Sequence, residues 1–549
     1  MKYQVLPSSA NMAFELRDRD LLGRIGRLKT KGGIVETPAF MPVINPLTQV
    51  IAPKRMKKEL QCNIVITNSY IIRKNFSDVP DLDVHRLLDY DGVVMTDSGA
   101  YQILVYGGVE INQDEIISYQ QKINSDIAVI LDIPTGWDVP RDRVEYTVDE
   151  TLRRAQAALP LIEGSDTLWV GPVQGGRHLD LVAKSAKAIG EMPFKVHALG
   201  SPTEVMERYM FPVLVDMIVT TKRNIPPDRP LHLFGAGHPM MFSLAVALGC
   251  DLFDSASYAL YAKDGRYLTP NGTLRLEDVN YLPCSCPVCR KHTAEELKTS
   301  TKGERERLLA EHNLYSCMTE IDAIKQAIFE GSLWDLVERR SRGHPSMTSA
   351  LKRLWEYRED LERGSPAFKG HGVFYYDQHS IARPEVTRYN RLLWENYGKP
   401  EGADTLVLIR EPPRKPFENS EEYRRFHHYL ANELGDKLDR LHLCFYVAPY
   451  GVVPAELSET YPLSQFEISK PLDAETIKHT AGEVASYVAR SGHHMVYFYR
   501  GRGDLDDAVE SALMTTCEEA KINLTTIWNN EPWGEDAFAA LSNTMKIRC

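Results

Sequence analysis

Long apolar runs are missing from this sequence. No stretch approaches the ~20 consecutive apolar residues that a membrane-spanning helix requires. The opening residues, MKYQVLPSSANMAFELRDRD, also lack the positively charged start and the apolar centre of a secretory signal peptide. These absences argue against a membrane protein and against a secreted protein, so we expect the chain to be cytoplasmic.

Cysteine is also scarce, with 9 among 549 residues. Three of them lie close together in the segment CSCPVC, which begins at Cys284. This tight cluster is more typical of a metal site in a reducing compartment than of a disulfide framework. We interpret the cysteines far from the cluster as isolated or buried thiols, namely Cys62, Cys250, Cys444, Cys517 and Cys549.

Positive charge is in deficit, because 64 lysines and arginines face 75 aspartates and glutamates, for a formal net charge of -11. Proteins that bind nucleic acid are usually basic where they contact phosphate, so RNA binding would have to use local basic patches. Three such clusters occur, and each fits either a phosphate contact or an ordinary solvated helix face. They are Arg339, Arg340 and Arg342; Lys352, Arg353 and Arg358; and Arg414, Lys415, Arg424 and Arg425.

The chain is long enough for about two to four domains. In its first part, short apolar segments end in small or polar residues and alternate with amphipathic stretches such as residues 149–162 and 179–189. This alternation is typical of parallel strands covered by helices, and eight strands over roughly 220 residues predict a (β/α)8 TIM barrel. The eight segments are residues 39–43, 63–68, 93–98, 127–132, 168–174, 195–200, 231–235 and 251–254.

An open doubly wound sheet would show the same alternation of strands and helices. A phosphate-binding G-x-G-x-x-G turn after the first strand would favour that fold, and the sequence has none. The barrel is therefore the better prediction. Residues 1–36 alternate polar and apolar positions around glycine turns, which predicts an antiparallel ribbon that leads into the barrel.

The residues that follow parallel strands converge on one mouth of a barrel, where barrel enzymes carry out their chemistry. Asp132 can accept paired donors from a flat heterocycle such as guanine, while Gln174 and Ser98 can both donate and accept. Tyr101 offers a face for a base to stack on. Asp97 and Asp254 then remain for covalent chemistry, unless they only cap the following helices. The residues expected at this mouth are Asp97, Ser98, Asp132, Gln174, Gly175, Gly176, Leu199, Gly200, His238 and Asp254.

Five short motifs follow one another in the order found in a known family. They are DSGAYQ (residues 97–102), VQGG (173–176), LGS (199–201), FDSASYA (253–259) and CSCPVC (284–289). Together they resemble the tRNA-guanine transglycosylase family, and the arrangement is similar to its archaeal branch, which installs the precursor of archaeosine. The resemblance implies exchange of a tRNA guanine, at position 15 of the D arm in that branch, for 7-cyano-7-deazaguanine.

The resemblance also implies a role for each matching residue. Asp254 takes the place of the nucleophile that attacks the ribose anomeric carbon, and Asp97 that of the general acid and base. Such a reaction retains configuration through a covalent glycosyl-carboxylate, which must be kept from water until the second base arrives. The positions that correspond to substrate binding are Ser98, Tyr101, Asp132, Gln174, Gly175, Leu199 and Gly200.

The cysteine cluster has the spacing C-x-C-x2-C, formed by Cys284, Cys286 and Cys289. Three thiolates and one imidazole suit a tetrahedral Zn²⁺ ion with no open position, which is a structural site. His292, His312 and Cys317 could each supply the fourth ligand. The family resemblance implies His312, and it also implies a homodimer formed near the metal region.

The character of the chain changes after the segment 364–366. We expect a catalytic domain over residues 1–365 that includes an inserted zinc-binding subdomain at 284–312, an accessory domain over 366–435, and a small α/β domain over 436–549. No PUA-type RNA-binding domain is recognisable. The accessory region resembles archaeosine synthase only in part, because the position of that enzyme's cysteine is not filled, and we interpret this region as a placement module. The matching residues are Lys415, Pro416, Phe417, Ser420 and His427 or His428.

Three alternatives to this function deserve a test. A transglycosylase of the queuosine type would use a different deazaguanine base. A non-catalytic tRNA-binding paralogue would have no physical reason to keep both Asp97 and Asp254. A metal-dependent hydrolase would need histidine and carboxylate ligands at the barrel mouth, whereas the cysteine cluster lies outside it.

Overall fold

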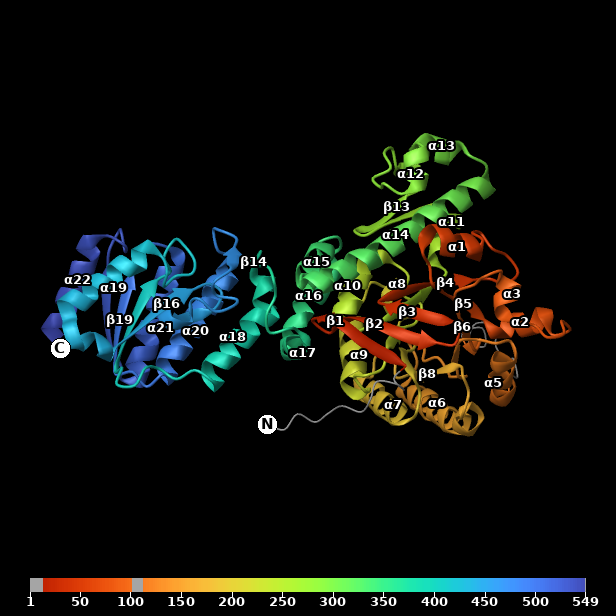
Figure 1. The fold of residues 1–549 in the computed structure, drawn as a ribbon, viewed down its shortest axis with the longest axis horizontal. Helices are drawn as coiled ribbons and strands as arrows, with labels where there is room; N and C mark the ends of the chain where they lie inside the picture. Colours follow the sequence, from red (N-terminus) through yellow and green to blue (C-terminus); the bar gives the residue numbers. More distant parts are fainter. Residues whose placement is uncertain (1–12, 101–111, 549) are drawn as a thin grey trace. The chain divides into compact units, whose positions relative to one another are not determined.

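The computed structural model describes residues 13–100 and 112–548. The chain divides into two compact units, Met1–Pro366 and Ala367–Cys549, which are coloured red to green and green to blue in Figure 1. Each unit has its own hydrophobic core.

The first unit opens with a three-stranded antiparallel sheet of β1 (Phe14–Asp20), β2 (Gly23–Thr30) and β3 (Gly33–Thr37). The antiparallel ribbon expected from the glycine turns is confirmed over this part. Phe14, Leu28 and Val35 join the same core cluster as the apolar residues that begin several barrel strands. The small sheet therefore packs against the end of the barrel where the strands begin, and it leaves the opposite end for the active site.

Eight parallel strands follow and close into a barrel in the order β10-β11-β4-β5-β6-β7-β8-β9. All eight predicted apolar segments form these strands, so the TIM barrel is confirmed. Inward and outward side chains alternate: Met95 and Val93 of β6 join the core, whereas Thr96 faces away and donates to Gln120. The strands are β4 (Ala39–Ile44), β5 (Ile64–Asn68), β6 (Val93–Asp97), β7 (Ile127–Val129), β8 (Leu168–Val173), β9 (Val196–Leu199), β10 (Leu231–Leu233) and β11 (Leu252–Ser255).

Helices surround the barrel, as Figure 1 shows for the part coloured red to yellow. The two amphipathic stretches predicted to be helical, residues 149–162 and 179–189, lie in α6 and α7. The described helices of this layer are α1 (Pro53–Leu60), α2 (Ser69–Phe76), α3 (Val84–Leu88), α5 (Gln113–Lys122), α6 (Arg141–Ile162), α7 (Leu179–Glu191), α8 (Thr203–Glu207), α9 (Phe211–Asn224) and α10 (Pro239–Ala247).

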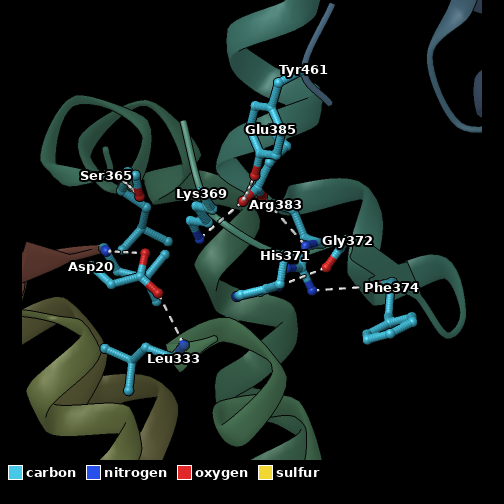
Figure 2. Close-up of polar contacts among 12 residues, drawn as sticks. Asp20, Leu333, Ser365, Lys369, His371, Gly372, Phe374, Arg383, Glu385 and Tyr461 are labelled. Atoms are coloured by element: carbon cyan, nitrogen blue, oxygen red, sulfur yellow. Dashed lines mark hydrogen bonds and ion pairs between the residues drawn. The ribbon is translucent and has the colours of Figure 1, made fainter. Parts of the chain in front are cut away.

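A subdomain with a short hairpin follows the last barrel strand. It comprises α11 (Ser257–Lys263), β12 (Arg266–Thr269), β13 (Gly272–Arg275), η2 (Leu276–Asp278), α12 (Pro287–Lys291), α13 (Ala294–Thr299) and the long α14 (Lys302–Glu330). The unit ends with α15 (Leu333–Ser341), α16 (Pro345–Arg353), η3 (Leu354–Tyr357) and α17 (Arg358–Gly364). Leu333 N–H donates to Asp20 Oδ2 at 2.9 Å, which ties the start of α15 to the end of β1 (Figure 2).

The second unit contains a five-stranded sheet in the order β17-β16-β15-β19-β20, parallel except for β17. Its strands are β15 (Thr405–Arg410), β16 (Leu441–Val447), β17 (Gly451–Pro454), β19 (Met495–Arg500) and β20 (Asn523–Trp528). The expected division at residues 435 and 436 falls between β15 and β16, which pair directly. A second small sheet joins β14 (Val373–Tyr375) to β18 (Phe466–Ile468). The helices are η4 (Gln378–Ala382), α18 (Pro384–Glu395), α19 (Glu421–Leu434), η5 (Gly435–Arg440), η6 (Ala455–Leu457), α20 (Ala474–Arg490), α21 (Asp504–Ala520) and α22 (Glu535–Arg548).

A buried ion group lies near the start of this unit (Figure 2). Lys369 Nζ is 2.9 Å from Glu385 Oε1, and Arg383 Nε is 3.4 Å from Glu385 Oε2. These two cations keep the pKa of Glu385 low, at about 2, although burial acts in the opposite direction. Removing one of these partners would leave a buried charge uncompensated, which is strongly destabilising.

No helix within the described residues is both long enough and apolar enough to cross a membrane.

Candidate active site

Five of the side chains predicted at the barrel mouth line one cavity, whose volume is about 1160 Å³. They are Asp97, Asp132, Gln174, His238 and Asp254. Asp97 is the last residue of β6 and Asp254 the next-to-last residue of β11, so both lie on the side of the barrel where parallel strands finish. The two carboxylates predicted to carry the chemistry therefore face a common space, as a single reaction centre requires.

Hydrogen bonds fix Asp254 through one of its two carboxylate oxygens. Its Oδ1 accepts a hydrogen bond from His232 Nε2 at 2.8 Å and another from the Gly235 backbone N–H at 2.9 Å. Within the described residues, Oδ2 accepts none. The side chain is 15% exposed, so a ligand in the cavity can reach the second oxygen. This arrangement suits a nucleophile with one fixed and one available oxygen.

Asp97 has a different environment from Asp254. Its Oδ2 accepts a hydrogen bond from the Asn68 side-chain amide at 3.1 Å, and Gly99 N–H lies 3.3 Å from the same oxygen. Burial, with the nearby charges of Asp132 and Asp254, raises the pKa of Asp97 to about 7. A carboxyl group that titrates near neutral pH can both give and take a proton, which suits a general acid and base.

Asp132 and Gln174 form a preorganised pair in the lining of the cavity. Gln174 Nε2 donates to Asp132 Oδ2 at 2.6 Å, while Gln174 Oε1 accepts from the Thr135 N–H at 3.1 Å and from the Ser201 hydroxyl at 3.0 Å. These contacts determine which way the amide points. Burial raises the pKa of Asp132 to about 6, against the opposing effect of the Gln174 hydrogen bond. The pair can present acceptors and a donor to a planar ligand in fixed positions.

Glycine is required where the chain passes this pair. A Cβ atom at position 200 would lie 2.3 Å from Gln174 Nε2, and one at position 175 would lie 2.6 Å from the backbone nitrogen of Val182. Gly175 also has φ +142, a conformation that other residues rarely adopt. Gly200 N–H donates to Val173 O at 2.8 Å, so this amide is already used inside the barrel.

The remaining predicted binding residues stand apart from these contacts. The Ser98 side chain is fully buried, and its hydroxyl has no hydrogen-bond partner among the described residues. Leu199 is buried in β9, and its carbonyl accepts from the Phe234 N–H at 3.3 Å. Tyr101 lies outside the described residues. Their roles in substrate binding remain predictions.

Sequence reasoning missed the residues that position the carboxylates. Asn68 was recognised as the end of an apolar segment, but its contact with Asp97 depends on the pairing of β5 with β6, which places the two side by side. His232 lies inside an apolar segment, and its contact with Asp254 likewise crosses to a neighbouring strand. For Ser201 the local signal is its place in the LGS motif, directly after Gly200. For His232 it is the alternation along β10, which places the side chain toward the barrel interior.

Cys284, Cys286, Cys289 and His312 come together as a group of four possible metal ligands. One donor atom from each residue lies within 4.8 Å of the other three. His312 Nδ1 is 3.5 Å from Cys286 Sγ and 3.4 Å from Cys289 Sγ. The sulfur and nitrogen donors therefore converge as a metal site requires, and the group can hold an ion.

The surroundings of His312 decide which of its nitrogens faces the sulfur atoms. Nε2 lies 2.9 Å from the Leu268 carbonyl and must donate to it, which leaves Nδ1 as the ligand atom. Tyr267 stacks on the ring with centroids 3.5 Å apart, and its hydroxyl lies 3.2 Å from Cys289 Sγ. Cys317, a rival for the fourth position, lies instead 3.6 Å from the Gly237 carbonyl. The convergence of donors thus includes His312, and neither Cys317 nor His292 belongs to the group.

The basic clusters differ in how their charges are used. Arg340 forms a bidentate pair with the buried Glu320 at 2.8 and 2.7 Å, and Arg353 Nε lies 2.8 Å from Asp216. These two arginines have structural partners. Arg339 and Arg342, at the end of α15 and directly after it, are exposed. A phosphate contact of these two side chains remains a prediction.

The accessory residues that partly match archaeosine synthase take part in local structure. Ser420 caps α19 by accepting from the Tyr423 N–H at 3.1 Å, and Lys415 Nζ lies 4.0 Å from the centre of the Phe466 ring. His428 Nε2 is 3.0 Å from the Asn432 side chain one turn further along α19. These contacts give the residues a role in the fold of the second unit.

Comparison with known proteins covers nearly the whole chain. A family model described as queuine tRNA-ribosyltransferase matches residues 19–346, and a model described as a domain of unknown function matches residues 386–545. A tRNA-guanine(15) transglycosylase of Aeropyrum pernix is 45% identical over 89% of this chain and 93% of its own length. Proteins with the same name from Methanosarcina acetivorans and Saccharolobus solfataricus are 47% and 40% identical, over 84% and 88% of this chain and 89% and 96% of their own lengths.

Proposed function

The chain belongs to the queuine tRNA-ribosyltransferase family of tRNA-guanine transglycosylases, and from this membership we propose that it exchanges guanine in tRNA for 7-cyano-7-deazaguanine. It is thus a pentosyltransferase. The relatives are named for guanine 15, so we assign the same nucleotide, in the D arm, as the target. The reaction is a step of archaeosine biosynthesis.

One observation carries the mechanism: two carboxylates in different environments line the same cavity. The pKa of Asp97 is raised to about 7, mainly by burial, whereas Asp254 is held through one oxygen by two N–H donors. In pairs of carboxyl groups whose environments differ in this way, one group acts as the general acid and the other as the nucleophile. We therefore assign the nucleophile to Asp254 and the proton transfers to Asp97.

The reaction consists of two displacements at the ribose. In the first, Asp254 Oδ2 attacks C1′, the bond from C1′ to guanine N9 breaks with its electron pair going to the base, and Asp97 supplies a proton to the base. In the second, the incoming base attacks C1′ through its corresponding nitrogen, Oδ2 leaves with the electron pair, and Asp97 takes up the proton. Two inversions at C1′ retain the configuration.

Base recognition uses the preorganised pair of Asp132 and Gln174. Asp132 can accept hydrogen bonds from the N–H groups on the pyrimidine edge of guanine, an edge that 7-cyano-7-deazaguanine shares. The orientation of the Gln174 amide, set by Thr135 and Ser201, leaves its second N–H to meet a carbonyl oxygen. Ser98, Gly175, Leu199, Gly200 and Tyr101 are proposed to complete this base pocket.

The four-residue sulfur and nitrogen group is proposed to hold one structural Zn²⁺ ion. Cys284, Cys286, Cys289 and His312 would fill a tetrahedral coordination sphere, so the ion would supply stability and no open position for chemistry. The subdomain also contributes Arg266 and Glu306 to the lining of the cavity. A metal-dependent hydrolase is not supported, because none of the four ligand residues is among those that line the cavity.

The other partners follow from the same proposal. Arg339 and Arg342 are proposed to contact tRNA phosphates, the chain is proposed to act as a homodimer in the cytoplasm, and the second unit is proposed to help place the tRNA. A non-catalytic paralogue is not favoured, since both reactive carboxylates are in place at the cavity.

The test is exchange of labelled guanine into unmodified tRNA, with and without 7-cyano-7-deazaguanine as competitor. The protein should incorporate the label, and the 7-cyano base should suppress incorporation irreversibly, whereas queuine or the aminomethyl base should not compete. Asp254→Asn should lose both the exchange and the denaturation-stable protein–tRNA adduct. Survival of either activity in Asp254→Asn would reassign the nucleophile, and competition by queuine alone would move the protein to the queuosine type.

A further inference from the structure

The two oxygens of Asp254 are not equivalent in this structure. Oδ1 accepts two hydrogen bonds, from His232 Nε2 at 2.8 Å and from Gly235 N–H at 2.9 Å, while Oδ2 accepts none within the described residues. This inference rests on the function proposed above. We propose that His232 is a positioning residue that selects Oδ2 as the attacking atom and favours the step in which the free carboxylate of Asp254 forms again.

The strand register of the barrel places His232 next to Asp254, with its side chain toward the barrel interior. In β10 it pairs with Ala198 of β9 and Leu252 of β11, and both of these side chains belong to the apolar interior of the barrel. Since neighbours in register point to the same side of a sheet, the imidazole also points inward. It is fully buried, and its only hydrogen bond within the described residues is the one to Asp254.

The chemistry of the contact determines the direction of the hydrogen bond. A carboxylate oxygen can only accept, so His232 Nε2 carries the proton and donates. Nδ1 is buried without a hydrogen-bond partner among the described residues, and the ring lies edge-on to Phe234 with centroids 4.6 Å apart. Burying this polar side chain is costly, and within the described residues the hydrogen bond to Asp254 is the one contact that offsets the cost.

The hydrogen bond matters because the charge on Oδ1 changes during the reaction. When Oδ2 bonds to C1′ and guanine departs with the electron pair of the broken C1′–N9 bond, Oδ1 becomes the carbonyl oxygen of a neutral ester. When the second base displaces Oδ2, the carboxylate and its charge return. Hydrogen bonds to charged groups are about twice as strong as those to neutral groups. His232 therefore stabilises the free carboxylate more than the ester and limits the lifetime of the adduct.

The prediction concerns the equilibrium between tRNA plus enzyme and adduct plus free guanine. In His232→Leu the donor is lost, and the guanine concentration that reverses half of the adduct should rise about tenfold, which corresponds to about 1.4 kcal/mol. His232→Gln, which retains an N–H donor at a similar reach, should stay within about threefold of the wild type. Both quantities are read from the denaturation-stable adduct on gels across a guanine titration.

His197 offers a matched control on the neighbouring strand. It is also a fully buried histidine of the barrel, and neither of its ring nitrogens has a hydrogen-bond partner among the described residues. It lies between Val196 and Ala198, whose side chains belong to the barrel interior, so it faces the helices. His197→Leu should leave the guanine midpoint unchanged.

The outcomes separate this inference from the proposed function. If the wild type forms no adduct at all, the proposed function itself fails. If the wild type forms the adduct, three results would show that the role of His232 is wrong. These are an unchanged guanine midpoint in His232→Leu, an equal shift of the midpoint in His197→Leu, and a shift in His232→Gln as large as that in His232→Leu. His232→Asn, whose amide is too short to donate at the same distance, replaces the leucine variant if that variant does not fold, and it carries the same expectation.

Discussion

Asp97 should reduce the stability of the barrel at neutral and alkaline pH, and removing its charge should restore that stability. Burial, together with the charges of Asp132 and Asp254, raises its pKa from the ordinary value of 3.8 to about 7. Between these two pH values the folded protein binds a proton that the unfolded chain has released. The free energy of unfolding therefore falls as pH rises through this window.

The size of the effect follows from the two pKa values. The rise from 3.8 to about 7 corresponds to about 4 kcal/mol once the group is ionised in both states, that is, above pH 7. Below pH 4 the carboxyl group is protonated in both states and contributes nothing. Asp97→Asn has nearly the same shape and no charge, so it should be more stable than the wild type by up to about 4 kcal/mol at pH 8 and by little at pH 4.

Chemical denaturation at several pH values measures this difference, followed by a probe of the unit that contains the barrel. Asp78→Asn serves as a control, because Asp78 is an exposed aspartate in the same unit. The control should show no pH-dependent gain. An equal stability of wild type and Asp97→Asn at pH 8, or a gain that is the same at pH 4 and pH 8, would refute the argument that burial and neighbouring charge hold the proton on Asp97.

Two further predictions concern the metal site and the RNA surface. His312→Ala should lose most of the bound zinc in elemental analysis, because three thiolates alone leave the tetrahedral sphere incomplete. His292→Ala should retain the zinc. Retention in His312→Ala together with loss in His292→Ala would assign the fourth ligand to His292. Arg339→Ala should weaken tRNA binding and reduce the slope of log affinity against log salt by about 1, measured by titration at several salt concentrations. Arg353→Ala should leave the slope unchanged, because this arginine is paired with Asp216, and an equal change in both variants would contradict the assignment.

Much of the fold could be predicted from local patterns. The eight apolar segments, the helices between them and the glycine-rich ribbon at the start all depend on periodicity over a few residues, and that periodicity is written in neighbouring positions. The identity of Asp97, Asp132, Gln174 and Asp254 as candidates also followed from short signals, since each ends or follows an apolar segment. The spacing of Cys284, Cys286 and Cys289 indicated a metal site in the same way.

The fourth metal ligand needed more than spacing. His292, His312 and Cys317 were all possible from the residues alone, and the family resemblance favoured His312. The structure brings His312 to the three cysteines because the long helix α14 packs beside the hairpin of β12 and β13, where Leu268 accepts from Nε2 of the histidine. Contacts between elements so far apart in the chain leave no trace in the local sequence.

The tertiary structure alone decided how each reactive group is held. The sequence by itself determined that a parallel barrel would carry aspartates at its mouth, because strand periodicity and strand ends are local properties. It did not determine that Asn68 would donate to Asp97, that His232 would donate to Asp254, or that the Gly200 N–H would be used by Val173. These contacts depend on the register between neighbouring strands, and register is set by the closure of the whole barrel.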